Sequence, residues 1–285
     1  MTVALIQLPY DSGHRETRMG RGPGHLVAAG APERIRAAGE EPVPAAIHSD
    51  HCLTAEIATG FELAGKLAGE VTRARRDGAW PLVLAGNCLS AVGAVAGLHE
   101  VPRLGVIWLD AHGDLNTPET TLTGFLDGMA LGVTVGWCFR ALAKTVPGFE
   151  AVEADRILHA GGRAWDAGER ALFTNSGMGE VPGREWAERG LLAMEPPLSA
   201  LARQVDAVYL HIDMDVHDAG ALRANPFASA GGPSAAQVRT GVQRIAEQVP
   251  IVGAGITALD PACDTDGAAS EAALELIGML ATRRA

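Results

Sequence analysis

Short apolar runs of strand length alternate along this chain with segments that have a helical pattern. Strands are expected at residues 3–8, 81–85, 104–109, 156–160, 207–212 and 250–256. Helices are expected at residues 55–76 behind a Thr54 cap, from Ser90 onward, at 128–135, after a capping box that starts at Ser234, and at 267–284. Such alternation is typical of a parallel sheet with helices on both faces, so the sequence predicts an α/β fold of three layers.

The length and composition suit a large folded core. With 285 residues, of which 47% are hydrophobic and 20% are charged, the chain fits one large α/β domain or two small ones. No internal repeat or low-complexity stretch divides it. We expect a single domain over residues 1–285, with residues 175–197 as an irregular excursion at its periphery.

The net charge limits the classes of binding partner, and the cysteines indicate the cellular compartment. The formal net charge of −11 argues against binding of nucleic acid or of an anionic membrane surface. No apolar run approaches the ~20 residues of a membrane-spanning helix, and the first residues lack the pattern of a secretory signal. Cys52, Cys88, Cys138 and Cys263 are widely spaced, which favours free thiols over a disulfide framework. We expect a cytoplasmic protein with no nucleic-acid or membrane partner.

Two clusters of potential metal ligands directly follow two of the expected strands. Asp110, His112 and Asp114 come after one strand, and Asp213 and Asp215 come after another. Alternate residues of an extended segment point to the same side, and in such folds ligands sit beyond the carboxyl ends of the strands. Carboxylates gathered there lose water only at a large cost unless a cation balances them. The pattern favours a divalent metal, with manganese best suited, magnesium less so and zinc an alternative.

Four motifs span nearly the whole chain. They are residues 8–13 (LPYDSG) with 18–23 (RMGRGP), residues 85–90 (AGNCLS), residues 110–121 (DAHGDLNTPETT), and residues 211–218 (HIDMDVHD) followed by Gly231 and Gly232. Their order resembles the arginase superfamily, the ureohydrolases that include agmatinase, formimidoylglutamase and hydroxyarginine amidinohydrolase. The third and fourth motifs together make this resemblance specific. It implies an arginase-like fold and hydrolysis of a small guanidino or amidino substrate.

The resemblance also implies two divalent ions, most directly Mn²⁺. Asp110 and Asp213 would bridge the ions. His112 and Asp215 would complete one site, and Asp114 would help to complete the other. A hydroxide held by both ions would attack a planar C=N centre and expel an amine, with Asp114 accepting the remaining proton of the hydroxide.

Cys88 stands in the second motif where the family usually has a metal-binding histidine. As a ligand, its thiolate would weaken the preference for manganese and raise the affinity for Zn²⁺ or Fe²⁺. As a small apolar side chain, it would only fill the core beside the strand end. Its position at an expected strand end favours the ligand, and some hydroxyarginine amidinohydrolases are similar here.

Asp127 stands where the family commonly has a histidine that carries a proton to the leaving amine. An aspartate can take this catalytic role only if burial or a second carboxylate raises its pKa. The alternative is that Asp127 caps the helix that follows it.

The substrate-binding positions are partly altered. Ala258 stands where arginase-like members usually have the carboxylate that holds the guanidinium, and the resemblance does not place Asp260, two positions on, in the pocket. Without that carboxylate, a cationic guanidinium loses a charge-assisted hydrogen bond worth ~1.5–3 kcal/mol. A hydroxyguanidine is less basic and needs this partner less.

Three further positions match the groups that bind the amino-acid end of the substrate. Asn116 and Thr123 correspond to two of these groups, and Asp166 corresponds to the carboxylate that meets the α-amino group. Each of these residue types is also common in turns. Residues 48–52 (HSDHC) have metal-like side chains but lie far from the motifs, and His217 lies beyond the expected strand end, so neither is expected to bind metal.

We expect a dinuclear metal-dependent hydrolase that cleaves a C–N bond of a linear guanidine or amidine, with hydroxyarginine a better candidate than plain arginine. One alternative is a non-catalytic arginase-like subunit or ligand-binding protein. In that case Cys88, Asp127 and Ala258 would be substitutions that accompanied the loss of catalytic activity. A transfer enzyme with Cys88 as nucleophile is weaker, because no histidine partner is evident. The resemblance also implies a homo-oligomer, a trimer or hexamer.

Overall fold

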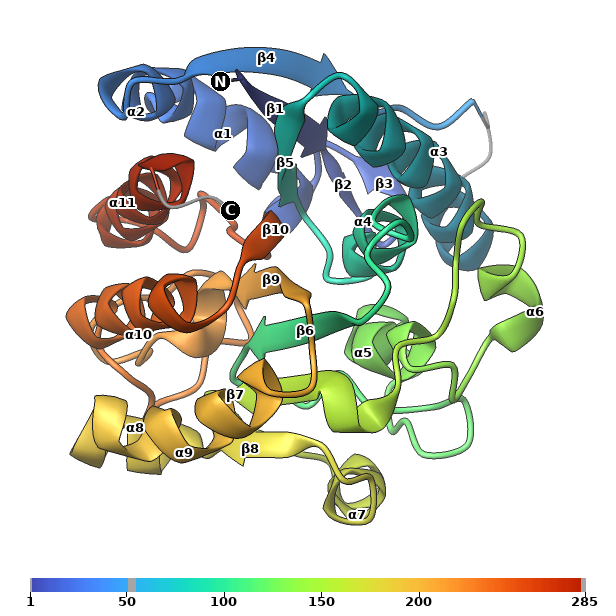
Figure 1. The fold of residues 1–285 in the computed structure, drawn as a ribbon, viewed down its shortest axis with the longest axis vertical. Helices are drawn as coiled ribbons and strands as arrows, with labels where there is room; N and C mark the ends of the chain where they lie inside the picture. Colours follow the sequence, from blue (N-terminus) through green and yellow to red (C-terminus); the bar gives the residue numbers. More distant parts are fainter. Residues whose placement is uncertain (1, 51–54, 283–285) are drawn as a thin grey trace.

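The computed structural model describes residues 2–50 and 55–282, and its centre is a parallel sheet (Figure 1). The strands are β1 (Thr2–Leu8), β4 (Glu41–Ala46), β5 (Ala79–Ala85), β6 (Leu104–Leu109), β7 (Ile157–Ala160), β8 (Gly179–Val181), β9 (Ala207–Asp213) and β10 (Ile251–Thr257). They form an eight-stranded sheet in the order β4-β1-β5-β10-β9-β6-β7-β8. Every neighbouring pair in this sheet is parallel. A short antiparallel hairpin, β2 (Tyr10–Asp11) with β3 (His14–Arg15), lies outside it.

Helices cover both faces of the sheet (Figure 1). One layer contains α3 (Glu56–Arg76), α4 (Ser90–Gly97), α5 (Ala130–Thr134) and α6 (Arg140–Ala143). The other contains α1 (Gly22–Ala28), α2 (Ala31–Ala37), α8 (Gly183–Arg189), α9 (Leu191–Ala202), α10 (Ala235–Gln248) and α11 (Ala268–Thr282). A further helix, α7 (Ala167–Thr174), lies near the β8 end of the sheet. The expected three-layer α/β/α fold with a parallel sheet is confirmed.

The strands divide their apolar side chains between two cores. In β1, Val3 and Leu5 pack into the core beneath α1, α2 and α11, whereas Ala4 and Ile6 pack into the core beneath α3 and α4. Successive side chains of a strand point to opposite faces, so a strand covered on both sides must be apolar throughout. This is the physical reason for the continuous apolar runs in the sequence.

The expectation of an irregular excursion at residues 175–197 is wrong. This segment contains β8, α8 and most of α9, and Trp186 and Met194 are fully buried there. Pro196 and Pro197 lie inside α9, where a proline costs ~3 kcal/mol. Burial of several large apolar side chains, at ~1.5–3 kcal/mol each, offsets that cost. The helical spacing of Met194, Leu198 and Leu201, which are all buried, was the available signal.

The start of α10 follows the cap that the sequence predicts. The capping box of α10 is present, because Ser234 Oγ accepts from the amide of Gln237 at 3.3 Å and the Gln237 side chain accepts from the amide of Ser234 at 2.9 Å. The expected cap Thr54 and the last residues of the closing helix, 283 and 284, lie outside the described residues. Within the described ranges, no helix is both long and apolar enough to cross a membrane.

The middle of the sheet brings four loops to one edge. Strands β5, β10, β9 and β6 are consecutive neighbours and all run in the same direction. Cys88 follows β5, Ala258 follows β10, Asp213 ends β9 and Asp110 follows β6. The carboxyl ends of these strands therefore position the candidate site.

Candidate metal centre and pocket

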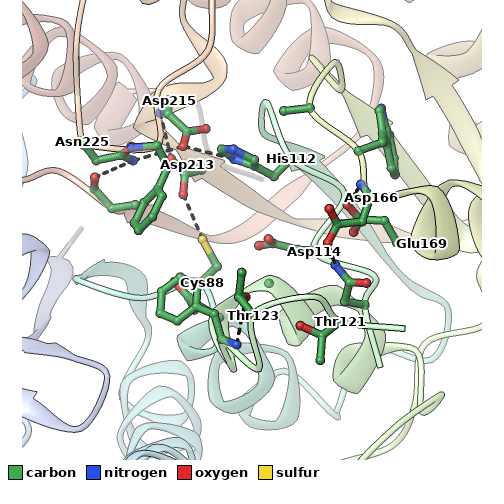
Figure 2. A pocket seen from close by; sticks show the side chains of 18 of the residues that line it. Cys88, His112, Asp114, Thr121, Thr123, Asp166, Glu169, Asp213, Asp215 and Asn225 are labelled. Carbon is green, nitrogen blue, oxygen red and sulfur yellow. Dashed lines mark hydrogen bonds and ion pairs between the residues drawn. The ribbon is translucent and has the colours of Figure 1, made fainter. Parts of the chain in front are cut away.

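A pocket of about 340 Å³ opens at these strand ends. Figure 2 shows the sulfur of Cys88 facing Asp213, with His112 and Asp114 on the neighbouring wall. All four side chains line the pocket, as does that of Asp215. The two carboxylate clusters of the sequence therefore meet in space.

Two groups of potential ligand atoms share one residue. The ligand atoms of Cys88, Asp110 and Asp114 lie within 4.8 Å of one another, and so do those of Asp110, His112 and Asp215. Asp110 belongs to both groups and is only 1% exposed. The residues expected to bind metal are thus gathered here, and their role as ligands stays a prediction.

Asp213 connects the two groups. Its Oδ2 accepts a hydrogen bond from the thiol of Cys88 at 3.0 Å, and its Oδ1 accepts from the amide of Asp215 at 2.8 Å (Figure 2). The thiol also lies 3.3 Å from the hydroxyl of Thr257. Cys88 is 2% exposed, and its sulfur points toward the carboxylates.

Other hydrogen bonds hold the carboxylates in place. Asp110 accepts from the amide of His112 at 2.7 Å and from Nε1 of Trp108 at 3.0 Å. Asp215 accepts from the side-chain amide of Asn225 at 3.1 Å. Asp114 has a φ of 50°, a left-handed conformation that is costly for a residue other than glycine and is often found at functional sites. The side chains are thus preorganised before any ligand is bound.

The cluster gathers more acidic groups than the neighbouring cationic side chains can balance if all are ionised. Burial, followed by the neighbouring carboxylates, raises the pKa of Asp114 and Asp213 well above the usual range. Burial and the carboxylate of Asp213 likewise raise the pKa of the Cys88 thiol. Burial lowers the pKa of His112, but Asp215 and Asp110 outweigh this effect and bring it to about 12. Buried acidic groups that repel one another, with oxygen, nitrogen and sulfur donors, fit a divalent cation.

Asp127 lines the same pocket but does not cap the helix that follows it, so that alternative is wrong. Its Oδ1 instead accepts from the amide of Leu89 at 2.8 Å, and its Oδ2 accepts from the side chain of Asn87 at 2.9 Å, at the start of α4. Burial outweighs these hydrogen bonds and raises the pKa of Asp127 to about 7. A catalytic proton carrier needs such a pKa, and that role stays a prediction.

The three residues expected at the amino-acid end of the substrate all line the pocket. Asn116 donates to Asp166 at 2.9 Å and accepts from the hydroxyl of Thr120 at the same distance. Asp166 is the N-cap residue of α7. Thr123 accepts from the amide of Phe125 at 3.2 Å. Each therefore has a local structural contact and also borders the pocket, so the structure allows both interpretations.

Ala258 borders the pocket, whereas Asp260 is not among its lining residues. Asp260 is buried and pairs with Arg21 at 3.3 Å. Across the described residues that line the pocket, no acidic side chain follows β10, the strand that Ala258 follows.

The positions that were not expected to bind metal lie outside both ligand groups among the described residues. Nδ1 of His217 lies 2.9 Å from the carbonyl oxygen of Met214. In the segment 48–52, the amide of Asp50 donates to Glu62 at 2.7 Å. His51 and Cys52 lie outside the described residues.

The pocket is also lined by residues that were not predicted as site residues, among them Asn225, Glu169, Phe125 and Phe227. Asn225 contacts Asp215, and Glu169 accepts from the amide of Leu115 at 3.2 Å. Phe125 and Phe227 form a ring pair with centroids 5.6 Å apart. The spacing of Asp166 and Glu169 is that of a capping box and could have identified Glu169. No local signal could have identified the ring pair, because its members lie far apart in the chain.

Comparisons with known proteins identify the family of this chain. A sequence model of the Arginase family matches residues 1–282. The arginase of Bacillus caldovelox is 28% identical over 290 residues, covering 98% of this chain and 97% of that protein. Human arginase-1 is 31% identical over 232 residues, covering 75% of this chain and 71% of that protein. The crystal structure of arginase from Bacillus cereus superposes with a TM-score of 0.89 at 28% identity, covering 98% of both chains. This chain belongs to the arginase family of hydrolases.

Proposed function

We propose that this protein is a dinuclear metal-dependent hydrolase that cleaves a C–N bond of a linear guanidine or amidine. The observation that carries the proposal is the pair of ligand groups that share Asp110 and whose other members all line one pocket. Two-metal hydrolases use such a shared carboxylate to hold both ions near one reacting centre.

The donor set divides between two ions. Cys88, Asp110 and Asp114 would hold one ion, and Asp110, His112 and Asp215 would hold the other. Asp213, which contacts the thiol and the amide of Asp215, is available to both. Bound divalent ions lower the pKa of a coordinated water and polarise the C=N bond of the substrate. Manganese suits the carboxylates and the imidazole, and the thiol adds affinity for Zn²⁺ or Fe²⁺.

Two carboxyl groups move the protons. A carboxylate oxygen of Asp114 accepts the remaining proton of the attacking hydroxide. A carboxyl oxygen of Asp127 delivers a proton to the nitrogen of the leaving amine. The pKa of about 7 at Asp127 supports this second step, because an acid with that pKa can both give and regain a proton near neutral pH.

The pocket favours a substrate less basic than arginine, with hydroxyarginine the best candidate. Ala258 offers no charge to a guanidinium, and the Phe125–Phe227 pair adds apolar surface to the wall. Asn116 and Asp166 supply polar atoms for an amino-acid end. The relatives reported above are named arginases, so a preference against arginine would distinguish this chain from them.

The test combines metal analysis with a substrate panel. Protein purified without chelators is analysed for manganese, zinc and iron, and is then assayed with arginine, hydroxyarginine and agmatine for release of urea or hydroxyurea. We expect two ions per chain and faster turnover of hydroxyarginine than of arginine. The variant Asp110→Asn, which alters the shared residue, should lose both metal and activity. A protein that takes up no metal under any loading condition would refute the proposal.

One observation supports a second candidate, a non-catalytic arginase-like subunit. The thiol of Cys88 donates to Asp213 and its pKa is raised, which is also the arrangement of a protonated, structural cysteine. That reading predicts one bound ion at most, Cys88 outside the coordination sphere and no turnover of any guanidino compound. The metal count and the substrate panel separate the two candidates.

The proposal treats residues 1–285 as one catalytic domain, since strands from both ends of the chain, β1 and β10, belong to the same sheet. Assembly into trimers or hexamers, which the family resemblance implies, and a cytoplasmic location, which the widely spaced cysteines favour, are further parts of the proposal. Light scattering after size-exclusion chromatography measures the assembly directly.

A further inference from the structure

Arg163 lies in the segment after β7 and reaches into the loop after β9. Its Nη2 donates to the carbonyl oxygens of Asp215 at 3.0 Å and His217 at 2.8 Å, and its Nη1 donates to that of Val216 at 3.1 Å. This loop carries the Asp213–Asp215 carboxylates. The guanidinium therefore holds the backbone of the loop that contains two of the proposed ligands, Asp213 and Asp215.

The same guanidinium also bonds to its own segment and to a distant one. Nη1 of Arg163 donates to the carbonyl oxygen of Gly161 at 2.9 Å, and Nη2 donates to that of Ser229 at 2.8 Å. The planar fork of arginine can satisfy several acceptors at once, whereas lysine has three donors on a single atom. Three segments thus meet on one side chain.

The backbone around Arg163 holds the other carboxylate loop. The amides of Arg163 and Ala164 both donate to the carbonyl oxygen of Ala111, at 2.8 and 2.9 Å. Ala111 lies between Asp110 and His112, and His112 forms a parallel bridge with Ala164. Arg163 consequently contacts both loops that carry the proposed ligands, through its backbone on one side and its side chain on the other.

The charge of Arg163 has no directly bonded counter-ion. Within residues 2–50 and 55–282, no carboxylate forms an ion pair with it, and the carboxylates of Asp215 and Asp110 act on it through space. A guanidinium bonded to carbonyl oxygens is suited to orienting a backbone, because it leaves the carboxylate oxygens of the proposed ligands available to a metal ion. Arg163 is also absent from the described residues that line the pocket, so it has no contact with a substrate there.

Gly232 packs directly against the guanidinium of Arg163. A Cβ at this position would lie 2.6 Å from both Cζ and Nη2 of Arg163, which is too close for a carbon atom. Gly232 follows the fourth sequence motif, and this close approach gives a physical reason for a glycine there.

We propose that Arg163 is a positioning residue that holds the Asp110–His112 loop and the Asp213–Asp215 loop in one geometry and so sets the metal affinity of both candidate sites. The proposal rests on the proposed metal centre. Residues that orient metal ligands typically change metal affinity by ~10–100-fold when they are replaced. Arg163 acts on the metal only through the ligands.

The test measures metal affinity and loop opening separately. Chelator-treated wild type, Arg163→Met, Arg163→Lys and Gly232→Ala are titrated with Mn²⁺ and with Zn²⁺ by calorimetry, and the stoichiometry is read by native mass spectrometry. We expect Arg163→Met to bind ~10–100-fold more weakly, and Arg163→Lys to recover part of that loss. Gly232→Ala keeps the charge but displaces the guanidinium, and it should also bind more weakly. If Arg163→Met fails to fold, the other two variants carry the test.

Hydrogen exchange of the metal-free proteins provides a second readout. Exchange should rise in Arg163→Met chiefly in residues 213–218, which the guanidinium contacts, and less in residues 110–116, which the unchanged backbone amides of residues 163 and 164 still hold. Arg244→Met is the matched control, because Arg244 is a half-buried arginine that pairs with Glu195 at 2.9 Å away from the pocket. It should keep the metal affinity of the wild type.

Two results would overturn the positioning role. One is an unchanged metal affinity in Arg163→Met together with a lower free energy of unfolding, which would make Arg163 a purely structural residue. The other is unchanged exchange in residues 213–218. If the wild type itself binds neither ion, the proposed function fails instead, and exchange in the two loops still decides whether Arg163 holds them together.

Discussion

Cys88 decides the character of the candidate metal centre at the scale of a single residue. A neutral imidazole at this position would suit manganese, whereas a thiolate is softer and adds negative charge to an already acidic cluster. The buried thiol donates to Asp213, so a metal that binds here must displace the thiol proton.

We predict opposite effects for two substitutions of Cys88. Cys88→His should keep or improve manganese occupancy, because imidazole is a harder, neutral ligand. Cys88→Ser should lose the ion that Cys88 shares with Asp114 but keep the ion at His112, because a serine hydroxyl is a poor ligand. Native mass spectrometry gives the number of ions per chain. Unchanged metal content and activity in Cys88→Ser would make Cys88 only a core residue.

Ala258 governs the charge that the pocket offers to its substrate. We predict that Ala258→Glu, which supplies the missing carboxylate, lowers the KM for arginine by ~10–100-fold, since a charge-assisted hydrogen bond contributes ~1.5–3 kcal/mol. The preference for hydroxyarginine over arginine should shrink accordingly in steady-state kinetics.

The matched control for Ala258→Glu is Ala262→Glu, which adds the same charge at an exposed position of the same loop, outside the lining of the pocket. Its KM for arginine should equal that of the wild type. An equal change in both variants would mean that net charge, and not the position of the carboxylate, is responsible.

At the scale of elements, the site depends on the strand ends and on the helices that start beside them. Asp127 bonds to the start of α4, and Asp166 caps α7, so helix termini hold two of the pocket residues. The capping interaction at α10 is simpler, because it lies away from the pocket and tests helix stability alone.

We predict that Ser234→Ala lowers the free energy of unfolding by ~1 kcal/mol, because it removes the hydroxyl that accepts from the amide of Gln237. Urea unfolding followed by circular dichroism measures this loss. Thr240→Ala, in the interior of the same helix, is the control and should be neutral or slightly stabilising, since alanine has the higher helix propensity. An equal loss in both variants would contradict a specific role for the cap.

At the scale of the whole molecule, the acidic cluster makes stability depend on pH and on metal. The pKa values of Asp114 and Asp213 are raised in the folded protein, whereas in the unfolded chain they lie near ~3.9. Above that value the folded protein holds protons that the unfolded chain has released. The stabilisation that these two groups give to the folded protein is therefore complete below about pH 4, and it is lost as the pH rises toward their folded-state pKa values.

We predict that Mn²⁺, at a fixed concentration about a hundred times its Kd at pH 6, raises the Tm by roughly 5 °C per bound ion at pH 6 and by more at pH 8. The ion replaces protons on the carboxylates, so the stabilisation that it gives the folded protein increases as the pH rises and those protons are lost more easily. Calorimetric scans of loaded and chelator-treated protein give the difference, in which titrations common to both forms cancel. A shift that is larger at pH 6 would contradict the prediction, and Asp110→Asn should abolish the shift.

Much of the fold could be predicted because its signals are local. The strands before Asp110 and Asp213 are continuous apolar runs, and both are confirmed as β6 and β9. The segment at residues 175–197 could not be read in the same way, because its mixture of polar side chains favours irregular structure locally. Burial of α8 and α9 against the sheet overrides that local preference.

The sequence alone determined which strand ends carry potential ligands, since Asp110 and His112 follow one apolar run, and Asp213 and Asp215 follow another. The expected alternation does not extend past β9, because residues 214–216 form a 3₁₀ helix. Only the tertiary structure decided which strand ends meet. Cys88, which follows β5, and Asp213, which ends β9, are 125 positions apart in the chain. They are brought together because β9 lies two strands from β5 in the sheet, with β10 between them. The order of strands is set by packing of the whole chain, so the contacts of Arg163 and the Phe125–Phe227 pair have no local sequence signal.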